Sequence, residues 1–269
     1  MIAALFAALV STPAATAACV PELPQAVAQG GLVVGRIDRG CTVRFGGRTL
    51  RVAGDGTFVF GVARDAPATL TVEAGPEKAA PHPYPITVTA RSWRLERVDG
   101  VPESTVNPAP ELAARILAEQ ARVARARERD DPRLDFRFGF IRPLAGRISG
   151  VYGSQRVLNG TAKSPHMGLD IAAPSGTPII APAAGIVTFV DPALYLTGGT
   201  LLIDHGHGLS SVFIHLSRID VAVGARIEQG QRIAAVGATG RASGPHLHWG
   251  LNWFGERLDP ALLIDRAAD

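Results

Sequence analysis

The sequence predicts a mainly β protein with three parts: an N-terminal β module, one linking α-helix, and a C-terminal antiparallel β-sheet or barrel-like domain. Short apolar runs separated by glycine and proline fill most of the chain, which is the pattern of short strands. Only one glycine-free stretch has the length and spacing of a helix. Of the 269 residues, 46% are hydrophobic and 19% are charged, which is typical of a folded globular protein rather than a disordered one.

Residues 1–18 are expected to be a secretory signal peptide. They are apolar and then small, and Ala15-Thr16-Ala17 fits a cleavage signal, although no Lys or Arg precedes the apolar run. The run is about half the length that a membrane span needs. We therefore expect a secreted or periplasmic mature chain without a transmembrane helix. In an oxidising compartment Cys19 and Cys41 are expected to form a disulfide; unpaired thiols or a lipid on Cys19 are the alternatives.

Residues 19–95 are expected to form a small β module for binding or spacing. Its strand candidates have sandwich-like spacing and are LVVGRI, TVRF, TLRV, TFVFGV and TLTV. The segment has no grouping of nucleophile, base or metal ligands. His82 stands alone among Pro81, Pro83 and Pro85, so we expect it to face solvent in a stiff proline-rich loop.

Residues 96–139 are expected to be a linker that contains a helix at about 110–129. The helical stretch is rich in Ala, Glu and Arg. Its apolar stripe consists of Leu112, Ile116, Leu117 and Val123. Its arginines are Arg115, Arg122, Arg125, Arg127 and Arg129. They could touch an anionic polymer, but the glutamates between them favour an ordinary solvated helix face.

Residues 140–269 are expected to form the antiparallel β domain. Apolar runs follow one another there with almost no helical periodicity. The runs are PIIAPAAGIVTFV, TLLIDHG, SSVFIHL, ARIEQGQRIAAVG and HLHWGLNW.

This C-terminal domain also holds six of the seven histidines, and some stand at informative spacings. His166 and Asp170 are four residues apart, and His246 and His248 are two apart. Both offsets are even, so each pair would project from one face of a β-strand. Gly168 would let the backbone come close to these side chains.

Converging imidazoles and a carboxylate indicate a divalent metal site, most often zinc. Three protein ligands with an open water position are the catalytic zinc pattern, whereas a closed structural site has four ligands. Neither cysteine lies in this domain, which excludes a structural thiolate site. The sequence also has no H-E-x-x-H motif, so no glutamate is placed as base in the manner of the zincins.

Three segments together resemble the lysostaphin-type, or LytM-like, zinc metallopeptidases that cut peptidoglycan peptides. These segments are H-M-G-L-D at 166–170, D-H-G-H-G at 204–208 with F-I-H-L-S at 213–217, and G-R-A-S-G-P-H-L-H at 240–248. The resemblance covers about residues 140–262, including G-T-P-I-I-A-P-A-A-G at 176–185. It implies zinc on His166, Asp170 and His248, with His215 and His246 as the catalytic pair.

Looser similarities extend the resemblance toward the N-terminus. The segment at 91–120 is similar to one that precedes this domain in exported proteobacterial members, and the β module resembles the Ig-like domains that such proteins carry. One departure is Phe213, where many members have Tyr, so a tyrosine hydroxyl is absent there.

The resemblance leads to a hypothesis for the mechanism. Zinc would lower the pKa of a bound water and polarise the scissile carbonyl. One of the two catalytic histidines would take the proton and pass it to the leaving amine, and the other would stabilise the oxyanion. We favour His246 as the base, because it would share a strand face with His248.

Four further residues have weaker predicted roles. His205 is expected to support the site by hydrogen bonding, and His207 to be exposed in the same glycine-flanked turn. Asn159 could donate an amide oxygen to the metal in a resting form, but a simple Asn-Gly turn is favoured. Arg156 could steady a carbonyl or carboxylate of the substrate.

The leading functional prediction is a zinc endopeptidase that hydrolyses peptide cross-links of bacterial peptidoglycan. Its expected partners are peptide stems, with a protein regulator or another wall-associated protein as a second candidate. One alternative is a non-hydrolytic regulator that binds and activates another cell-wall hydrolase, and another is a metal-dependent wall-binding module. The complete set of ligands and catalytic histidines favours the enzyme. A net charge of +3 would suit an anionic wall polymer but is too small to indicate a nucleic-acid partner.

Overall fold

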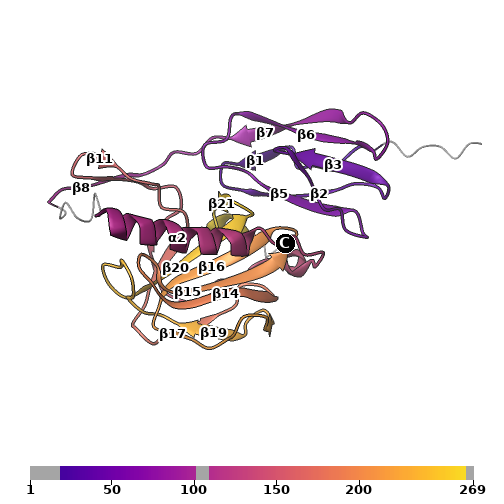
Figure 1. Ribbon diagram of the computed structural model, residues 1–269. Helices are drawn as coiled ribbons and strands as arrows, with labels where there is room; N and C mark the ends of the chain where they lie inside the picture. The colour runs from indigo at the N-terminus through magenta and orange to yellow at the C-terminus, as the bar shows by residue number, and fades with distance from the viewer. Residues whose placement is uncertain (1–18, 101–108, 265–269) are drawn as a thin grey trace, which may run out of the picture.

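The computed structural model describes residues 19–100 and 109–264 (Figure 1). The predicted signal peptide lies outside these ranges. Within them, no helix has both the length and the hydropathy that crossing a membrane requires. The chain is mainly β, as predicted, and most of its strand pairs are antiparallel. One long helix separates the N-terminal strands from most of the C-terminal strands along the sequence.

The N-terminal module contains two small sheets, with strand orders β1-β7-β6-β3-β4 and β2-β5. Its strands are β1 (Ala26–Ala28), β2 (Leu32–Arg36), β3 (Cys41–Phe45), β4 (Arg48–Thr49), β5 (Thr57–Gly61), β6 (Thr69–Pro76) and β7 (His82–Thr89). All five predicted runs contain or overlap strands. Cys19 and Cys41 form the expected disulfide, with Cα atoms 5.6 Å apart. The bond ties the first described residue to β3.

The proline-rich segment is a strand, so its prediction as a loop was wrong. Backbone N–H groups of alternate β7 residues, such as Val88, point toward β6. Pro83 and Pro85 are at the alternate positions, whose backbone nitrogens point toward the other edge of β7. On that edge β1 pairs only with Thr87–Thr89. The missing N–H groups of the two prolines therefore interrupt no ladder. His82 begins this strand and is exposed, as expected.

The N-terminal module and the C-terminal domain share one hydrophobic core. The rings of Phe45 and Trp253 lie 6.1 Å apart, and Gly61 packs against Trp253 and Leu258. An ion pair of 2.7 Å joins Arg91 to the buried carboxylate of Asp259. The N-terminal module is therefore fixed against the C-terminal domain by packing as well as by charge.

A second connection runs through the segment before the helix. Strand β8 (Leu95–Val98) pairs in parallel with β10 (Gln155–Leu158), which also forms a hairpin with β11 (Thr161–Ala162). Residues predicted to begin the linker thus add a strand to a sheet of the C-terminal domain.

Helix α2 (Pro110–Arg127) matches the predicted helix and ends two residues earlier. Proline at its first turn, Glu111 near its start and arginines in its last turn suit the helix geometry and dipole. The helix lies across one face of the large sheet (Figure 1), where Val123 belongs to a buried cluster with Phe189, Leu202 and Val212. Leu117, predicted to lie on the apolar stripe, is 65% exposed. A short 3₁₀ helix, η1 (Asp135–Phe138), follows.

The C-terminal domain is built on an eight-stranded sheet in the order β18-β14-β15-β16-β20-β12-β9, with β21 paired to β20. Its strands are β9 (Arg147–Gly150), β12 (Leu169–Ala172), β14 (Gly185–Leu194), β15 (Gly198–Gly206), β16 (Leu209–Leu216), β18 (Arg226–Ile227), β20 (His246–Trp253) and β21 (Glu256–Leu258). A smaller sheet is formed by β13 (Pro178–Ile180), β19 (Arg232–Ala235) and β17 (Arg218–Ile219). The last described element is α3 (Ala261–Ile264).

The large sheet has two different faces. One face belongs to the main core, which includes Ile203, Phe213 and Trp249. The opposite face is partly covered by α2 and carries His248 at the same level as Ile214. We call the second face the site face.

Candidate metal centre

Strand β20 presents its two histidines on the site face. His246 and His248 alternate with Leu247 and Trp249, whose side chains are fully buried on the core face. The strand assignment and the alternation are as predicted. Asp170 of β12 lies directly opposite His248 in the antiparallel register, so these two side chains project from one face as neighbours.

His166 reaches the same point from a loop, not from a strand. It precedes β12, so the argument from an even offset to Asp170 was wrong. Its backbone is fixed instead by two hydrogen bonds: its N–H donates to Ser154 O (2.8 Å), and its carbonyl accepts from Gly153 N–H (2.7 Å). Its Nδ1–H donates to Val151 O at 2.9 Å. Nε2 is therefore the ring nitrogen that faces Asp170.

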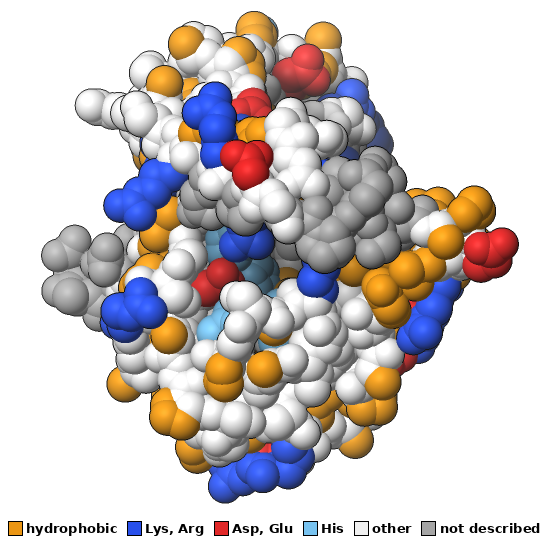
Figure 2. Space-filling model, turned by 90° about the vertical axis from the view of Figure 1, so that its left-hand side faces the viewer, with side chains coloured by type: hydrophobic (Ala, Val, Ile, Leu, Met, Phe, Trp, Pro, Cys, Tyr) orange, Lys and Arg blue, Asp and Glu red, His pale blue; other side chains and the backbone are white. Residues whose placement is uncertain are grey.

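Three donor atoms meet in what we call the His–Asp–His cluster. His166 Nε2 lies 2.9 Å from both Asp170 Oδ1 and His248 Nδ1, and His248 Nδ1 lies 2.8 Å from Asp170 Oδ1. All three side chains are largely buried. Figure 2 shows histidine side chains at the base of a hollow, with acidic and basic side chains around it. The cluster offers two imidazoles and one carboxylate to a single cation.

The pKa shifts of Asp170 and His248 favour the protonation states that bind a cation. Burial alone would raise the pKa of Asp170, but hydrogen bonds from His166 and His248 outweigh it and hold the pKa well below its usual range. The carboxylate is therefore ionised. Burial lowers the pKa of His248, so its imidazole is neutral at physiological pH. Metal ligands need these protonation states.

Two glycines allow this close packing. A Cβ atom on Gly150 would lie 2.4 Å from Asp170 Oδ2, and one on Gly168 would lie 2.5 Å from His248 Nε2. Both contacts are shorter than any real Cβ contact. The close backbone approach expected at Gly168 is thus present, and Gly150 does the same from β9.

His215 and His246 form a second histidine pair beside the cluster, with ring centroids 4.9 Å apart. His246 Nδ1–H donates to Gly244 O and His215 Nδ1–H donates to Thr239 O, both at 2.8 Å. Each Nε2 is left with a lone pair, and that of His246 lies 3.9 Å from Asp170 Oδ1. Burial lowers the pKa of His215 to about 4.

A β-bulge turns the His215 side chain toward His246. Between Phe213 and Leu216 strand β16 carries one residue more than β15 opposite it, and His215 has a left-handed φ of 63°. Regular alternation would send His215 to the core face, because Ile214 already occupies the site face. Left-handed backbone at a non-glycine residue is strained and is often found at functional sites.

His205 lies on the core face, away from the cluster. Its Nδ1–H donates to Ala184 O, and its Nε2 accepts from the Ser211 hydroxyl at 2.8 Å. Ser211 Oγ in turn accepts from the Trp249 indole N–H at 3.2 Å. Any support that His205 gives the cluster passes through Trp249, the neighbour of His248. His207, predicted to be exposed, is 3% exposed and packs edge-on against Phe136.

Asn159 and Arg156 lie on the β10–β11 hairpin. Asn159 and Gly160 have φ angles of 47° and 76° and are exposed at its tip, which is the simple Asn-Gly turn favoured from the sequence. Arg156 is exposed on β10 and pairs through its backbone with Glu96.

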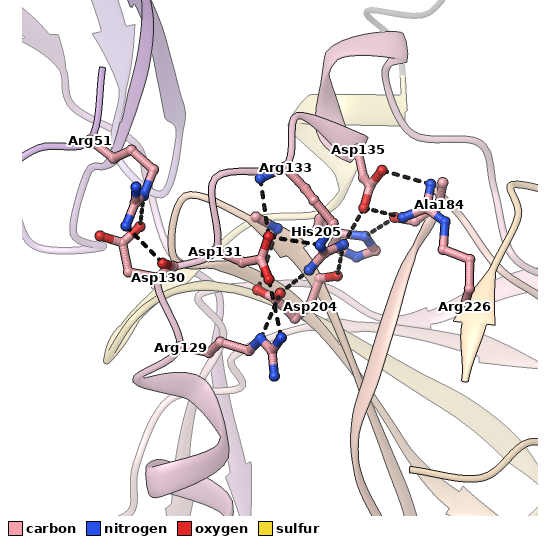
Figure 3. A network of polar contacts seen from close by, with 11 residues as sticks. Arg51, Arg129, Asp130, Asp131, Arg133, Asp135, Ala184, Asp204, His205 and Arg226 are labelled. Carbon is pink, nitrogen blue, oxygen red and sulfur yellow. Dashed lines mark hydrogen bonds and ion pairs between the residues drawn. The ribbon is translucent and has the colours of Figure 1, made fainter. Parts of the chain in front are cut away.

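A charged network, not anticipated from the sequence, fastens the segment after α2 to the sheet (Figure 3). Arg133 contacts the carboxylates of Asp131, Asp135 and Asp204, and Arg226 also contacts Asp135. The D-D-P-R-L-D run at 130–135 was its only sequence signal. Because Asp204 immediately precedes His205 at the end of β15, the network holds this turn and the end of α2 together.

Comparisons with known proteins identify the family to which the C-terminal domain is similar. The family model of peptidase family M23 matches residues 164–260. An uncharacterized metalloprotease of Haemophilus influenzae is 36% identical over 129 residues, and peptidoglycan DD-endopeptidase ShyA of Vibrio cholerae is 39% identical over 106 residues. These alignments cover 45% and 39% of this chain but only 26% and 24% of the relatives, so the chain spans about a quarter of their length.

One solved structure matches nearly the whole chain. It is a protein from Pseudomonas aeruginosa described as a peptidase of the same family, with a TM-score of 0.70 and 31% sequence identity. The match covers 88% of this chain and 94% of that one, so the N-terminal module and the helix are included. With full-length similarity at this level and the family model over its C-terminal domain, the chain belongs to peptidase family M23.

Proposed function

We propose that this protein is a zinc-dependent endopeptidase that hydrolyses peptide cross-links of bacterial peptidoglycan. The observation that carries the proposal is the His–Asp–His cluster with a second histidine pair beside it. A relative named as a peptidoglycan endopeptidase supports the substrate class.

The donor set of the cluster fits zinc. Two imidazoles and one carboxylate match catalytic zinc sites, which keep three protein ligands and one open position. The name of the Haemophilus influenzae relative supports a metal-dependent enzyme. His166, Asp170 and His248 would hold the ion, which would polarise the scissile carbonyl and lower the pKa of a water. The hydrogen bond from His166 Nδ1 to Val151 O fixes the ligand tautomer.

We propose that His246 acts as the general base. Its Nδ1–H is committed to Gly244 O, so Nε2 is free to accept a proton and to pass it to the leaving amine. His215 is neutral in the resting site, because burial lowers its pKa to about 4. A negative oxyanion beside its Nε2 would raise the pKa of His215, so that the imidazole would take up a proton from solvent and donate a hydrogen bond from Nε2.

The disulfide supports an exported protein. A bond between Cys19 and Cys41 persists in oxidising compartments and is rare in the cytosol. We therefore propose that the chain acts in the periplasm or outside the cell, where peptidoglycan is accessible. With Cys19 in a disulfide, lipid anchoring at that residue is not part of the proposal.

The test combines metal analysis with mass spectrometry of products released from purified sacculi. We expect about one zinc per chain and new products with cleaved peptide cross-links. Bound zinc without any product would contradict the endopeptidase and indicate a wall-binding module, whereas neither zinc nor product would indicate the regulator. Removal of zinc by a chelator should stop cleavage, and added zinc should restore it.

A further inference from the structure

A cavity of about 150 Å³ lies between α2 and the site face, directly beside the His–Asp–His cluster. Val123 and Arg127 of α2 line it on one side, and Val212 and Ile214 of β16 on the other. His248 of the cluster is part of its wall. One water needs about 10–15 Å³, so this space has room for a group of several atoms.

The wall of the cavity is cationic. Arg127 and Arg257 both line it, and no aspartate or glutamate is among the lining residues. In the part of the chain that the structure describes, the buried Nε–H of Arg127 has no hydrogen-bond acceptor and its guanidinium forms no ion pair. A buried donor without a partner destabilises the folded chain, and more so when the group is charged. A ligand that supplies the acceptor would remove this cost.

Arg257 is held in place on the same wall. Its Nη1 donates to Asn252 Oδ1, and Asn252 Nδ2 donates to Ser210 O at 3.3 Å, which fixes the orientation of the amide. Burial lowers the pKa of Arg127 to about 9, and the positive charge of Arg257 adds to the effect. Two like charges thus face a shared space.

We propose that Arg127 and Arg257 form a subsite for a free carboxylate of the peptide substrate, at a chain end or on a side chain near the scissile bond. The inference rests on the proposed endopeptidase function and specifies what the substrate must carry. Guanidinium groups bind carboxylates through paired hydrogen bonds, which gives both affinity and orientation. Because the cavity shares His248 with the cluster, a carboxylate held there orients the peptide across the catalytic pair.

The kinetic test compares a cross-linked peptide that has a free carboxylate next to the scissile bond with the same peptide as its carboxamide. The zinc-loaded wild type should prefer the carboxylate by roughly 10- to 100-fold in kcat/KM, mainly through KM. Arg127→Gln and Arg257→Gln should reduce this preference to near unity. Arg125→Gln is the matched control, because it removes an exposed charge from the same helix; the preference should persist in it.

A second measurement needs no turnover. In the His246→Ala background, calorimetric titration with the carboxylate peptide should show binding that Arg127→Gln weakens by a similar factor. Without peptide, Arg127→Gln should leave the melting temperature unchanged or raise it, because it removes an unpaired buried charge. A purely structural arginine would lower the melting temperature on substitution and leave selectivity unchanged.

Equal cleavage and equal binding of the two peptides by the wild type would overturn the subsite and leave the peptidase function intact. The same conclusion follows if Arg125→Gln loses selectivity as fully as Arg127→Gln, since net charge would then explain the effect. If neither peptide is cleaved by zinc-loaded wild type, the proposed function fails. The binding preference alone then decides whether the two arginines receive a carboxylate.

Discussion

The two faces of β20 differ in what they contribute. On the core face, Leu247, Trp249 and Leu251 are completely buried in the main hydrophobic core. On the site face, His246 and His248 are only partly buried and point at other polar groups. A single strand therefore carries core residues at its odd-numbered positions and the two site histidines at even-numbered positions. The difference predicts that substitutions on the two faces will separate loss of folding from loss of activity.

The largest effect is expected from His248→Ala on the site face. Loss of one of three ligands should abolish zinc binding, and with it several kcal/mol of transition-state stabilisation, or about 1000-fold or more in rate. The variant should still unfold cooperatively, because the core face is unchanged. Zinc content, muropeptide cleavage and circular dichroism check the three statements. His82→Ala, an exposed histidine of β7, is the control and should keep full activity.

His246→Ala and His215→Ala test the roles of the two histidines beside the His–Asp–His cluster. Neither residue belongs to the His–Asp–His cluster, so zinc should stay bound. In contrast, kcat should fall by roughly 10²–10⁴-fold, through lost proton transfer in His246→Ala and lost oxyanion stabilisation in His215→Ala. The measurements are zinc stoichiometry and single-turnover cleavage rates. Unchanged turnover in either variant would remove that histidine from the mechanism.

Trp249→Ala probes the core face one residue away from His248. Removing a fully buried indole should lower the free energy of unfolding by roughly 3–5 kcal/mol, measured by urea denaturation. The variant molecules that remain folded should still bind zinc, because Trp249 faces away from the cluster. A stability loss below about 1 kcal/mol would mean that the core face does not dominate folding.

A smaller, pH-dependent effect is expected from His205, also on the core face. Burial lowers its pKa from 6.5 to about 4, and its Nδ1–H and Nε2 already have a carbonyl acceptor and a hydroxyl donor. As the pH falls from 6.5 toward 4, the unfolded chain takes up a proton that the folded chain does not. Stability present above pH 6.5 should then decline by about 3 kcal/mol. Urea denaturation as a function of pH measures this.

His205→Asn provides the comparison for that titration. The asparagine does not titrate, so its stability should change less than that of the wild type over the same pH range, even though it starts lower at pH 7. Parallel curves for the two proteins would show that other groups account for the acid sensitivity.

Periodicity predicted the parts of this molecule that follow regular geometry. The alternation in β20 placed His246 and His248 on one face, and the end of the linking helix was predicted to within two residues. The ligand set and the catalytic pair came from the resemblance of short motifs to a family. The structure brings these five residues together; their roles remain proposals.

Irregular backbone and long-range contacts account for what the sequence did not predict. His166 lies in a loop, and His215 reaches the site face only through a bulge, which no alternation pattern contains. The charged run at 130–135 lay within the predicted linker, and its partners Asp204 and Arg226 are far away in the sequence. Arg127 was assigned to a solvated helix face, because its burial depends on β16 and β21, which come 80 or more residues later in the chain.

The parallel pairing of β8 with β10 has a consequence for how the protein can be divided. Strand β8 (Leu95–Val98) precedes α2, yet it pairs with the β10–β11 hairpin, which comes after α2 in the chain. Proteolytic cleavage between Glu128 and Asp135 would leave the strand bound to its hairpin without a covalent link. A fragment that began after the cut would carry an uncovered strand edge, which tends to recruit another copy of the same chain. Aggregation of such fragments would then reflect a missing neighbour rather than a damaged catalytic domain.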